Sequence, residues 1–536
     1  MAVVQIDVAL FRKMVINGAI NLKNHQAEVD AFNVFPVPDG DTGTNMSMTV
    51  TSGIRELETC ESSSIIDNAK VLSRGALMGA RGNSGVILSQ FFRGLYVGLK
   101  EIQHNYLDIH DLMNCLKSGC KVAYKAVMEP VEGTILTVVR EAAENTEANI
   151  DKFSSIDELV DFYYAEACKS LERTPELLPV LKEAGVVDSG GAGFCKVVEG
   201  MNLALKGKIL SVESEEHAEK KEKKIETKYI YVTELKIDLK KPDSFDVKEL
   251  IAPLSLLGEY VKVEKVDNQA LVSVNNDRPG RVIEICQKQG EFVTFKIENI
   301  KNQNEEPKQE AKQAEPEKDS ALIAVCFGSG IVQTFKEMGV DYVIEGGQTM
   351  NPSTESFVEA IKSVNAKNVI IIPNNGNVVM AAKQAAGLVG NINVRVLPAK
   401  TIAQGYVSLI NYNPEAGIDE NVAAMTEQVE HVKSGEITYS IRDTEIKGVK
   451  INSGDFMGIA DGEIVVSTAK KEDALSGLLE KIIEEDSEII TFFVGADVTE
   501  DEKQLVEDVC LNINSNLDVE IIDGNQDIYS YIIAVE

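Results

Sequence analysis

The sequence predicts a multidomain protein with an all-α N-terminal domain, a small α+β middle domain and an α/β C-terminal domain. Its 536 residues are about three or four times the length of a common single domain. Two stretches, ESEEHAEKKEKKIETK and NQNEEPKQEAKQAEPEKD, are dense in Glu, Lys, Gln and Pro and offer little to bury, so we expect them to be linkers. The predicted boundaries are 1–207 for the N-terminal domain, 208–227 for a charged linker, 228–300 for the middle domain, 301–319 for a second charged linker and 320–536 for the C-terminal domain.

The N-terminal domain is predicted to be helical because its apolar residues recur at spacings of three and four. The pattern is clear in QIDVALFRKMVINGAINLKNH, IIDNAKVLSRGALMG, SGVILSQFFRGLYVGLKEI and TILTVVREAAENTEA. Runs rich in β-forming residues are missing from this part of the sequence. We therefore expect about eight helices here.

The other two domains are predicted to contain strands. In the middle domain, YIYVTELKI, YVKVEKV, ALVSVNN and FVTFKIENI read as strands joined with one or two short helices. In the C-terminal domain, the short apolar runs ALIAVCF, VDYVIEG, NVIIIP and NVRVLP alternate with helical patterns, which is typical of βαβ units. A further set of strand-like runs follows residue 433.

Composition excludes several classes of protein. The formal net charge of −32 argues against nucleic acid or an anionic membrane surface as the main partner, since both require a basic surface. No apolar run approaches the ~18 residues of a membrane span, and the N-terminus lacks the features of a signal peptide, so we expect a cytoplasmic protein. The eight cysteines form no C-x-x-C pair, which indicates neither a disulfide framework nor a zinc knuckle.

The stretch NVFPVPDGDTGTN, residues 33–45, places Asp39 and Asp41 on a proline-restricted turn just before a predicted helix. An EF-hand that begins at Asp39 would need an oxygen ligand, a glycine and a glutamate at loop positions 5, 6 and 12. Those positions hold Gly43, Thr44 and Val50, so an EF-hand is excluded.

Two interpretations of this turn remain open. Asp41 or Thr42 can simply cap the following helix, because Asp, Thr and Gly are common in turns and at helix starts. Alternatively, the two carboxylates can hold Mg²⁺, which prefers one or two carboxylates together with water and phosphate oxygens. In that case the backbone amides of residues 42–45, at a helix N-terminus, would face the phosphates of a nucleotide.

Three more glycine-rich turns precede predicted helices in the same domain. GARGNSGVILSQFFRG contains Asn83 and Ser84, EPVEGTILTVVREA contains Gly133 and Thr134, and GVVDSGGAGF contains Asp188. Each turn alone is more often an ordinary helix start than a binding site. Four such turns in one helical domain could converge at one end of a bundle.

These four motifs, in this order, resemble the ATP-binding L-type domain of dihydroxyacetone kinases. They are still more similar to the kinase subunit of bacterial fatty acid kinases. The stretches VIEGGQTMNPSTE, VIIIPNNGNVVMAAKQA and LPAKTIAQG look like the C-terminal region of that subunit, so the resemblance covers the whole chain.

The resemblance implies an eight-helix barrel that binds ATP at one end, with Asp39 and Asp41 as the catalytic, magnesium-binding residues. The dihydroxyacetone kinases use a third Asp upstream, for which the nearest candidate here is Asn33, at a different spacing. The nucleotide contacts carried over by position are Thr42, Gly43, Thr44, Asn45, Asn83, Ser84, Gly133, Thr134 and Asp188.

The function that the resemblance implies is transfer of the γ-phosphate of ATP to the carboxylate of a fatty acid. A separate fatty-acid-binding carrier protein would present the acid and dock on the C-terminal domain, and the acyl phosphate would enter phospholipid synthesis. The family also implies a homodimer. A carboxylate is already ionised at pH 7, so no general base is needed, and the five histidines all lie outside the site motifs.

Two other functions remain as alternatives. The chain could be the ATP-binding subunit of a dihydroxyacetone-type kinase, although no segment resembles the substrate-binding unit with a reactive His that those enzymes need. It could also be a non-catalytic nucleotide-binding scaffold, against which the intact metal and phosphate motifs argue.

The middle domain departs from the family in one respect. Much of the family carries a Cys in a YCTE stretch and two His in a VHIHTDDPG stretch, which together look like a zinc site. The corresponding stretches here are YVTE and VSVNNDRPG, with Val232, Ser273 and Asn275 at the three positions. Since neither Val nor Ser offers zinc a usable ligand, we predict that this domain binds no zinc.

Overall fold

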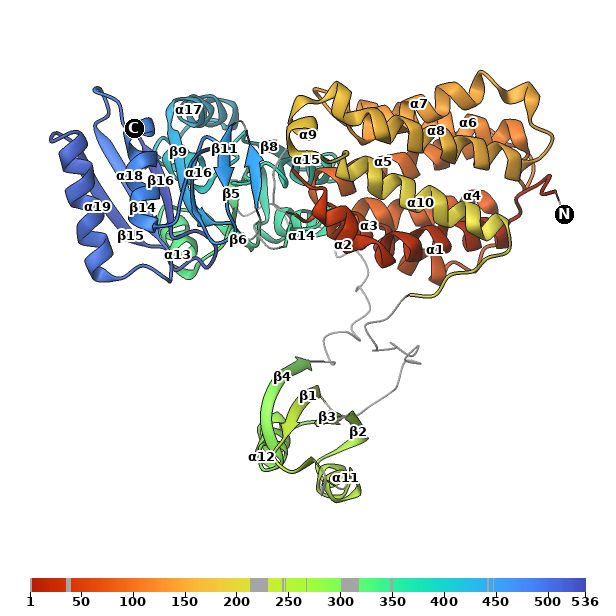
Figure 1. Ribbon diagram of the computed structural model, residues 1–536, viewed down its shortest axis with the longest axis horizontal. Helices are drawn as coiled ribbons and strands as arrows, with labels where there is room; N and C mark the ends of the chain where they lie inside the picture. Colours follow the sequence, from red (N-terminus) through yellow and green to blue (C-terminus); the bar gives the residue numbers. More distant parts are fainter. Residues whose placement is uncertain are drawn as a thin grey trace. The chain divides into compact units, whose positions relative to one another are not determined.

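The computed structural model divides the chain into two compact units (Figure 1). One unit contains Met1–Glu213 together with Pro316–Glu536, and the other contains Ser214–Glu315. The structure describes residues 2–34, 40–212, 230–242, 245, 247–266, 268–299, 318–347, 350–440, 443–446 and 448–536. Most of both predicted linkers, 208–227 and 301–319, lies outside the described residues, and the predicted domain boundaries stay a prediction.

The N-terminal part of the first unit is helical, as the sequence predicts. Its described residues contain eight α-helices of 13 to 22 residues and two of six residues. The helices are α1 (Val8–Asn24), α2 (Gln26–Ala31), α3 (Thr42–Thr59), α4 (Ile65–Met78), α5 (Gly82–Leu99), α6 (Ile109–Lys125), α7 (Ile135–Glu147), α8 (Ile156–Leu177), α9 (Pro179–Ala184) and α10 (Ser189–Leu205), with a 3₁₀ turn at Ile150–Lys152. The short helices α2 and α9 were not predicted separately, and closure of the long helices into a barrel stays a prediction.

Five of these helices, α1, α4, α6, α8 and α10, begin at a residue whose side chain caps the helix, and the long helices bury an apolar face. Asp7, for example, caps α1 by accepting a hydrogen bond from the backbone amide of Leu10 at 2.8 Å. The buried face of α1 includes Phe11, Met14 and Leu22, and it packs against α10. None of the helices in the described part of the chain combines the length and apolar composition that crossing a membrane requires.

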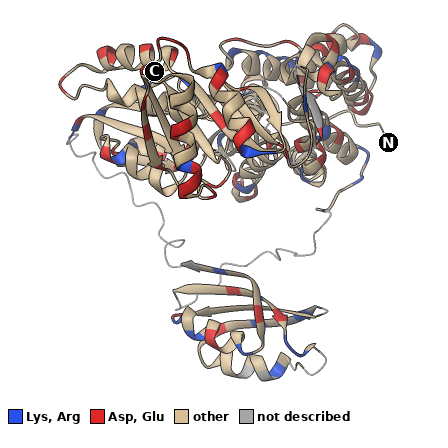
Figure 2. Ribbon diagram, turned by 60° about the vertical axis from the view of Figure 1, so that its left-hand side comes forward, with Lys and Arg blue, Asp and Glu red and all other residues tan. Residues whose placement is uncertain are grey.

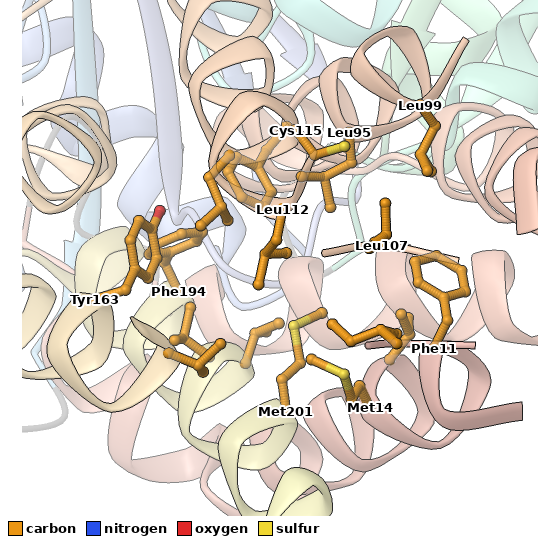
Figure 3. A pocket seen from close by; sticks show the side chains of 17 residues that line it. Phe11, Met14, Leu95, Leu99, Leu107, Leu112, Cys115, Tyr163, Phe194 and Met201 are labelled. Atoms are coloured by element: carbon orange, nitrogen blue, oxygen red, sulfur yellow. The ribbon is translucent and has the colours of Figure 1, made fainter. Parts of the chain in front are cut away.

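A small apolar cavity lies inside this helical core (Figure 3). Its volume is about 60 Å³, and its lining includes Phe11, Leu112, Phe194 and Tyr163. The Tyr163 hydroxyl is buried without a hydrogen-bond partner among the described residues, and burial raises the pKa of this phenol. The cavity exposes only apolar atoms, so it offers no polar partners that would hold an ordered water.

The C-terminal part of the first unit contains two sheets. The first has four parallel strands in the order β6-β5-β7-β8, with apolar clusters on both faces. This is the predicted α/β arrangement. Its strands are β5 (Lys318–Cys326), β6 (Tyr342–Glu345), β7 (Ala366–Ile372) and β8 (Asn393–Val396), and its helices are α13 (Ser329–Glu337), α14 (Thr354–Ser363), α15 (Val379–Ala386), α16 (Ile402–Ile410) and α17 (Ile418–His431).

The second sheet is mixed rather than parallel, which the prediction of an α/β domain did not include. Its six strands have the order β13-β12-β9-β16-β14-β15, and only β14 and β15 pair in parallel. The elements are β9 (Lys433–Tyr439), β12 (Phe456–Ala460), β13 (Glu463–Thr468), α18 (Lys471–Ile482), β14 (Ile489–Val494), α19 (Glu500–Ile513), β15 (Asp518–Asp523) and β16 (Tyr531–Val535), with a separate hairpin of β10 (Thr444–Ile446) and β11 (Val449–Ile451). Short apolar strands leave pairing direction open, because buried parallel and antiparallel strands share the same residue types.

The parallel sheet packs directly on the helical part of the same unit. Ala80 and Val86, at the start of α5, belong to the same apolar cluster as side chains of β5, β7 and α14. The backbone amide of Thr354 donates to the carbonyl oxygen of Ala80 at 3.1 Å, and Gln90 donates to Gln384 at 2.7 Å. The carboxyl edge of the sheet is therefore held against the start of α5.

The second unit is a four-stranded antiparallel sheet with two helices, which agrees with the predicted α+β class. Its strand order is β2-β3-β1-β4. The elements are β1 (Tyr231–Leu239), α11 (Val247–Ser255), β2 (Gly258–Val266), β3 (Gln269–Asn276), α12 (Pro279–Gln287) and β4 (Gly290–Asn299). A small core that includes Ile237, Val272 and Leu250 lies between the sheet and the helices. Asp and Glu residues occur along both units (Figure 2), in keeping with the net charge of −32.

The three positions at which the resemblance implies zinc ligands in the family lie on neighbouring strands. Val232 pairs directly with Asn275, and Ser273 is two residues away on the same face of β3. This face is half-buried, whereas the alternate residues of β3 point into the core. The backbone thus places the three side chains together, and the residue types decide whether zinc can bind.

We expect the triple variant Val232→Cys/Ser273→His/Asn275→His to bind about one zinc ion per chain, because a thiolate and two imidazoles would then share one face of the sheet. The wild-type chain should retain no zinc after dialysis against EDTA. Zinc content can be measured by inductively coupled plasma mass spectrometry on both purified proteins. Equimolar zinc in the dialysed wild type would contradict the prediction.

Candidate functional site

The start of α3 is held by polar side chains from α2 and the residues after it. The Asn33 side-chain oxygen accepts hydrogen bonds from the Thr42 hydroxyl and, at 3.1 Å, from the Thr42 backbone amide. Asp30 accepts from the backbone amide of Thr44 at 3.0 Å and from its hydroxyl at 2.9 Å. These bonds satisfy amides that a helix start otherwise leaves without partners, each of which costs about 1–3 kcal/mol when buried.

This arrangement differs from the expectation that the amides of residues 42–45 face phosphate. The amides of Thr42 and Thr44 have side-chain acceptors, and the amide of Asn45 donates to the carbonyl oxygen of Asp41 at 2.8 Å. Among the described residues only the amide of Gly43 lacks an acceptor in this turn. Gly43 itself allows close packing, since a Cβ there would lie 2.4 Å from the carbonyl oxygen of Gln26.

The structure describes one of the two predicted metal-binding residues. Asp39 lies outside the described residues. Asp41 is the N-cap residue of α3, and one of its carboxylate oxygens accepts a hydrogen bond from the side-chain amide of Asn351 at 2.6 Å. Asn33, the nearest candidate for a third metal ligand, already uses its side-chain oxygen to cap α3.

The start of α5 lies against the start of α3. Gly82 has a φ of +59°, and a Cβ there would lie 2.6 Å from the side-chain nitrogen of Asn45, so this position favours glycine. The Arg81 backbone amide donates to the Thr49 hydroxyl at 3.2 Å, and its guanidinium donates to the carbonyl oxygen of Asn351 at 2.5 Å. Burial lowers the pKa of Arg81 from its usual high value.

The other two residues of this motif face the C-terminal part of the unit or solvent. The side-chain amide of Asn83 donates to Asn377, after β7, at 3.1 Å. Ser84 is half-buried. The parallel sheet therefore contacts the second predicted motif through Asn377 and the first through Asn351.

The starts of α10 and α7 complete the cluster. Asp188 caps α10 by accepting from the backbone amide of Gly191 at 2.7 Å, and it also accepts from the backbone amide of Ile135 at the start of α7. The Ser189 hydroxyl donates to the Thr42 hydroxyl at 3.1 Å, which ties α10 to α3. Asp188 is buried, and burial raises its pKa to about 6.

The remaining two site candidates lie before α7. Gly133 has a φ of +83°, and its amide donates to the Thr137 hydroxyl at 2.8 Å. Thr134 is the N-cap residue, although its hydroxyl donates to the carbonyl oxygen of Val131 at 2.7 Å. The structure thus brings the four predicted turns together, at the starts of α3, α5, α7 and α10.

Sequence reasoning missed Asp30, Arg81 and Asn351. Arg81 lies inside a motif that the sequence analysis singled out, and its charge was the signal that could have found it. Asn351 lies in the polar loop GGQTMNPST, 310 residues from Asp41, and no local pattern links the two.

Three models of known protein domains match the chain. The DAK2 domain matches residues 36–203, the middle domain of FakA-like fatty acid kinase proteins matches 228–307, and the C-terminal domain of the same proteins matches 321–536. Protein YloV of Bacillus subtilis is 42% identical over 100% of both chains. The chain belongs to the FakA-like fatty acid kinase family.

Other matches include a second full-length relative and a distant solved structure. A Staphylococcus saprophyticus protein is 42% identical to this FakA-like chain over 99% of this chain and 100% of its own. A crystal structure of dihydroxyacetone kinase from C. freundii, in complex with AMP-PNP and Mg²⁺, covers 54% of this chain and 55% of its own at 11% identity, with a TM-score of 0.30.

We expect Asp188→Asn to become more stable relative to wild type as pH rises. The folded-state pKa of about 6 lies above the ordinary 3.8, so the buried acid is neutral at low pH and must ionise in the folded protein as pH rises. The stability of the neutral acid is lost between those two pKa values, whereas the amide of Asn does not titrate. Linkage gives a relative gain of about 1–2 kcal/mol between pH 5 and 7.5.

Urea unfolding of both proteins across this pH range measures the difference. A stability difference that stays constant with pH would show that Asp188 is ionised throughout and that its two amide donors outweigh its burial.

Proposed function

We propose that this FakA-like protein transfers the γ-phosphate of ATP to the carboxylate of a fatty acid, which a separate fatty-acid-binding carrier protein presents. The acyl phosphate product would feed phospholipid synthesis. The observation that carries the proposal is the meeting of four helix starts with Asp41 and Arg81, in a chain of the FakA-like fatty acid kinase family.

The residues present fit a magnesium–nucleotide site. Magnesium prefers hard oxygen ligands, and the Asp41 carboxylate accepts a hydrogen bond from the side-chain amide of Asn351, whose own oxygen is buried without a hydrogen-bond partner among the described residues. We propose Asp39 and Asp41 as the magnesium-binding residues. When bound, the ion neutralises charge on the phosphates that would otherwise repel an anionic acceptor.

The chain's own part in the reaction is to bind and to orient. The Arg81 guanidinium and the Asp41 carboxylate both bond to Asn351, and the four helix starts that meet here carry the positive ends of their helix dipoles. We propose that the phosphates are held by Arg81 and the Gly43 amide together with the polar side chains Thr42, Thr44, Asn45, Asn83, Ser84 and Thr134, and by the turns at Gly133 and Asp188.

The chemistry requires no base from the protein. An oxygen of the fatty acid carboxylate forms a bond to the γ-phosphorus, the bond from that phosphorus to the bridging oxygen breaks, and ADP leaves with the electron pair. A carboxylate is ionised at pH 7 and carries no proton to remove. A hydroxyl acceptor such as dihydroxyacetone would have to lose its hydroxyl proton.

The C-terminal part, residues 320–536, is proposed to dock the carrier protein, and the chain is proposed to form a homodimer. The loops after β6 and β7 already contact the helical part through Asn351 and Asn377. A carrier bound to the C-terminal part would therefore lie near the starts of α3 and α5, where the acid must meet the nucleotide.

The decisive experiment compares acceptors with the full-length chain. We expect magnesium-dependent ATP consumption with a purified carrier loaded with fatty acid, and none above background with dihydroxyacetone. Phosphorylation of dihydroxyacetone would identify the alternative kinase. Tight ATP binding without turnover on any acceptor would identify a non-catalytic scaffold.

We expect Asp41→Ala to lower kcat by at least about a hundredfold at saturating Mg²⁺, because the cation site loses a charged ligand. The exposed Asp151, on the 3₁₀ turn, provides a control, and Asp151→Ala should retain wild-type turnover. Unfolding curves would show that both variants fold. Near-normal turnover by Asp41→Ala would refute its assignment as a metal-binding residue.

A further inference from the structure

We propose that Asn351, from the C-terminal part, completes the divalent-cation site of Asp41 by supplying its side-chain oxygen as a ligand. The inference rests on the proposed function, because it concerns the same site. It means that the cation is bound by two segments 310 residues apart, one from each side of the contact between the helices and the parallel sheet.

The first observation is where the Asn351 side chain lies. It is 2% exposed, and its amide nitrogen is 2.6 Å from a carboxylate oxygen of Asp41. Neighbouring oxygen ligands of an octahedral magnesium ion lie about 3 Å apart, since each is about 2.1 Å from the metal. The side-chain amide is therefore already at the distance from Asp41 that a second ligand would have.

The second observation is the state of the oxygen of the same amide. The Asn351 side-chain oxygen is buried and has no hydrogen-bond partner among the described residues. Buried carbonyl oxygens are rarely left without a partner. A carboxylate attracts the N–H group when no cation is present, whereas a cation between the two groups attracts the oxygen. Rotation of the amide exchanges these two atoms without moving the backbone.

The third observation is that the backbone around Asn351 is held in place. Its carbonyl oxygen accepts from the Arg81 guanidinium at 2.5 Å, and two residues later Ser353 caps α14. The following amide, of Thr354, bonds to the carbonyl oxygen of Ala80. These bonds fix the segment against the start of α5. The loop is therefore already ordered, and binding of the cation would cost little conformational entropy.

The geometry points to a site that depends on contact between the two parts of the unit. The helical part supplies Asp41, and the loop before α14 supplies Asn351. Separation of the sheet from α5 would remove one ligand and would expose the other to water.

The test measures cation binding rather than activity. Full-length protein with saturating AMP-PNP is titrated with Mn²⁺, and free Mn²⁺ is followed by electron paramagnetic resonance. We expect Asn351→Ala to weaken Mn²⁺ binding by about tenfold or more. Asn351→Asp keeps an oxygen ligand but has no N–H group to donate. We therefore expect this variant to recover most of the wild-type affinity for Mn²⁺ and to bind at least as tightly as Asn351→Ala.

A purely structural role would give the reverse order. If the N–H group mattered only for holding Asp41, Asn351→Asp would repel the carboxylate and bind Mn²⁺ more weakly than Asn351→Ala. That result would overturn the proposal, as would wild-type affinity in Asn351→Ala.

Two further variants distinguish loss of a ligand from a weaker contact between the helices and the sheet. Gln384, on α15, donates to the carbonyl oxygen of Leu77 and to the Thr354 hydroxyl, so Gln384→Ala weakens the same contact without touching the cation site. We expect it to bind Mn²⁺ like wild type, and a loss equal to that of Asn351→Ala would overturn the ligand assignment. If Asp41→Ala bound Mn²⁺ with wild-type affinity, the proposed site as a whole would be refuted. If Asp41→Ala lost Mn²⁺ affinity and Asn351→Ala did not, only the role of Asn351 would be refuted.

Discussion

The contact between the carboxyl edge of the parallel sheet and the start of α5 is the constraint on which the candidate site depends. Ala80 and Val86 are buried with apolar side chains of β5 and β7, so the two parts of the unit share one core cluster. Burial of apolar surface is the main favourable term in folding. The hydrogen bonds across the contact are directional, so they fix the orientation of the two parts. Arg81 and Asn351 meet only because this apolar contact holds their segments together.

The same contact bears on how an acidic chain could hold the anions of the proposed reaction. The protein has a net charge of −32, and ATP and a fatty acid carboxylate are both negative. In the candidate site, this negative charge is offset locally by the Arg81 guanidinium and by the positive ends of four helix dipoles. Some of the backbone amides at these helix starts donate hydrogen bonds to side chains of the protein itself, namely Asp30, Asn33 and Asp188. These bonds fix the conformation of the turns without a ligand.

The middle unit shows that backbone placement and residue type contribute separately to a site. Val232 and Asn275 face each other across β1 and β3, with Ser273 beside them. The strands place these side chains together whatever the residues are, so a Cys and two His at these positions would lie on one face of the sheet. The sheet here is held by its own core, which includes Ile237 and Val272.

The sequence by itself determined the helical and strand-containing parts of the chain, because apolar periodicity is a local property that each element carries. It also identified the four turns whose residues meet at the candidate site, since glycine and capping residues mark helix starts wherever the helices later pack. Only the tertiary structure decided which polar groups pair. Asn33 caps α3, Asp188 joins α7 to α10, and Asn351 reaches Asp41 across 310 residues. Hydrogen bonds between distant segments depend on how the elements pack, and no local pattern records that.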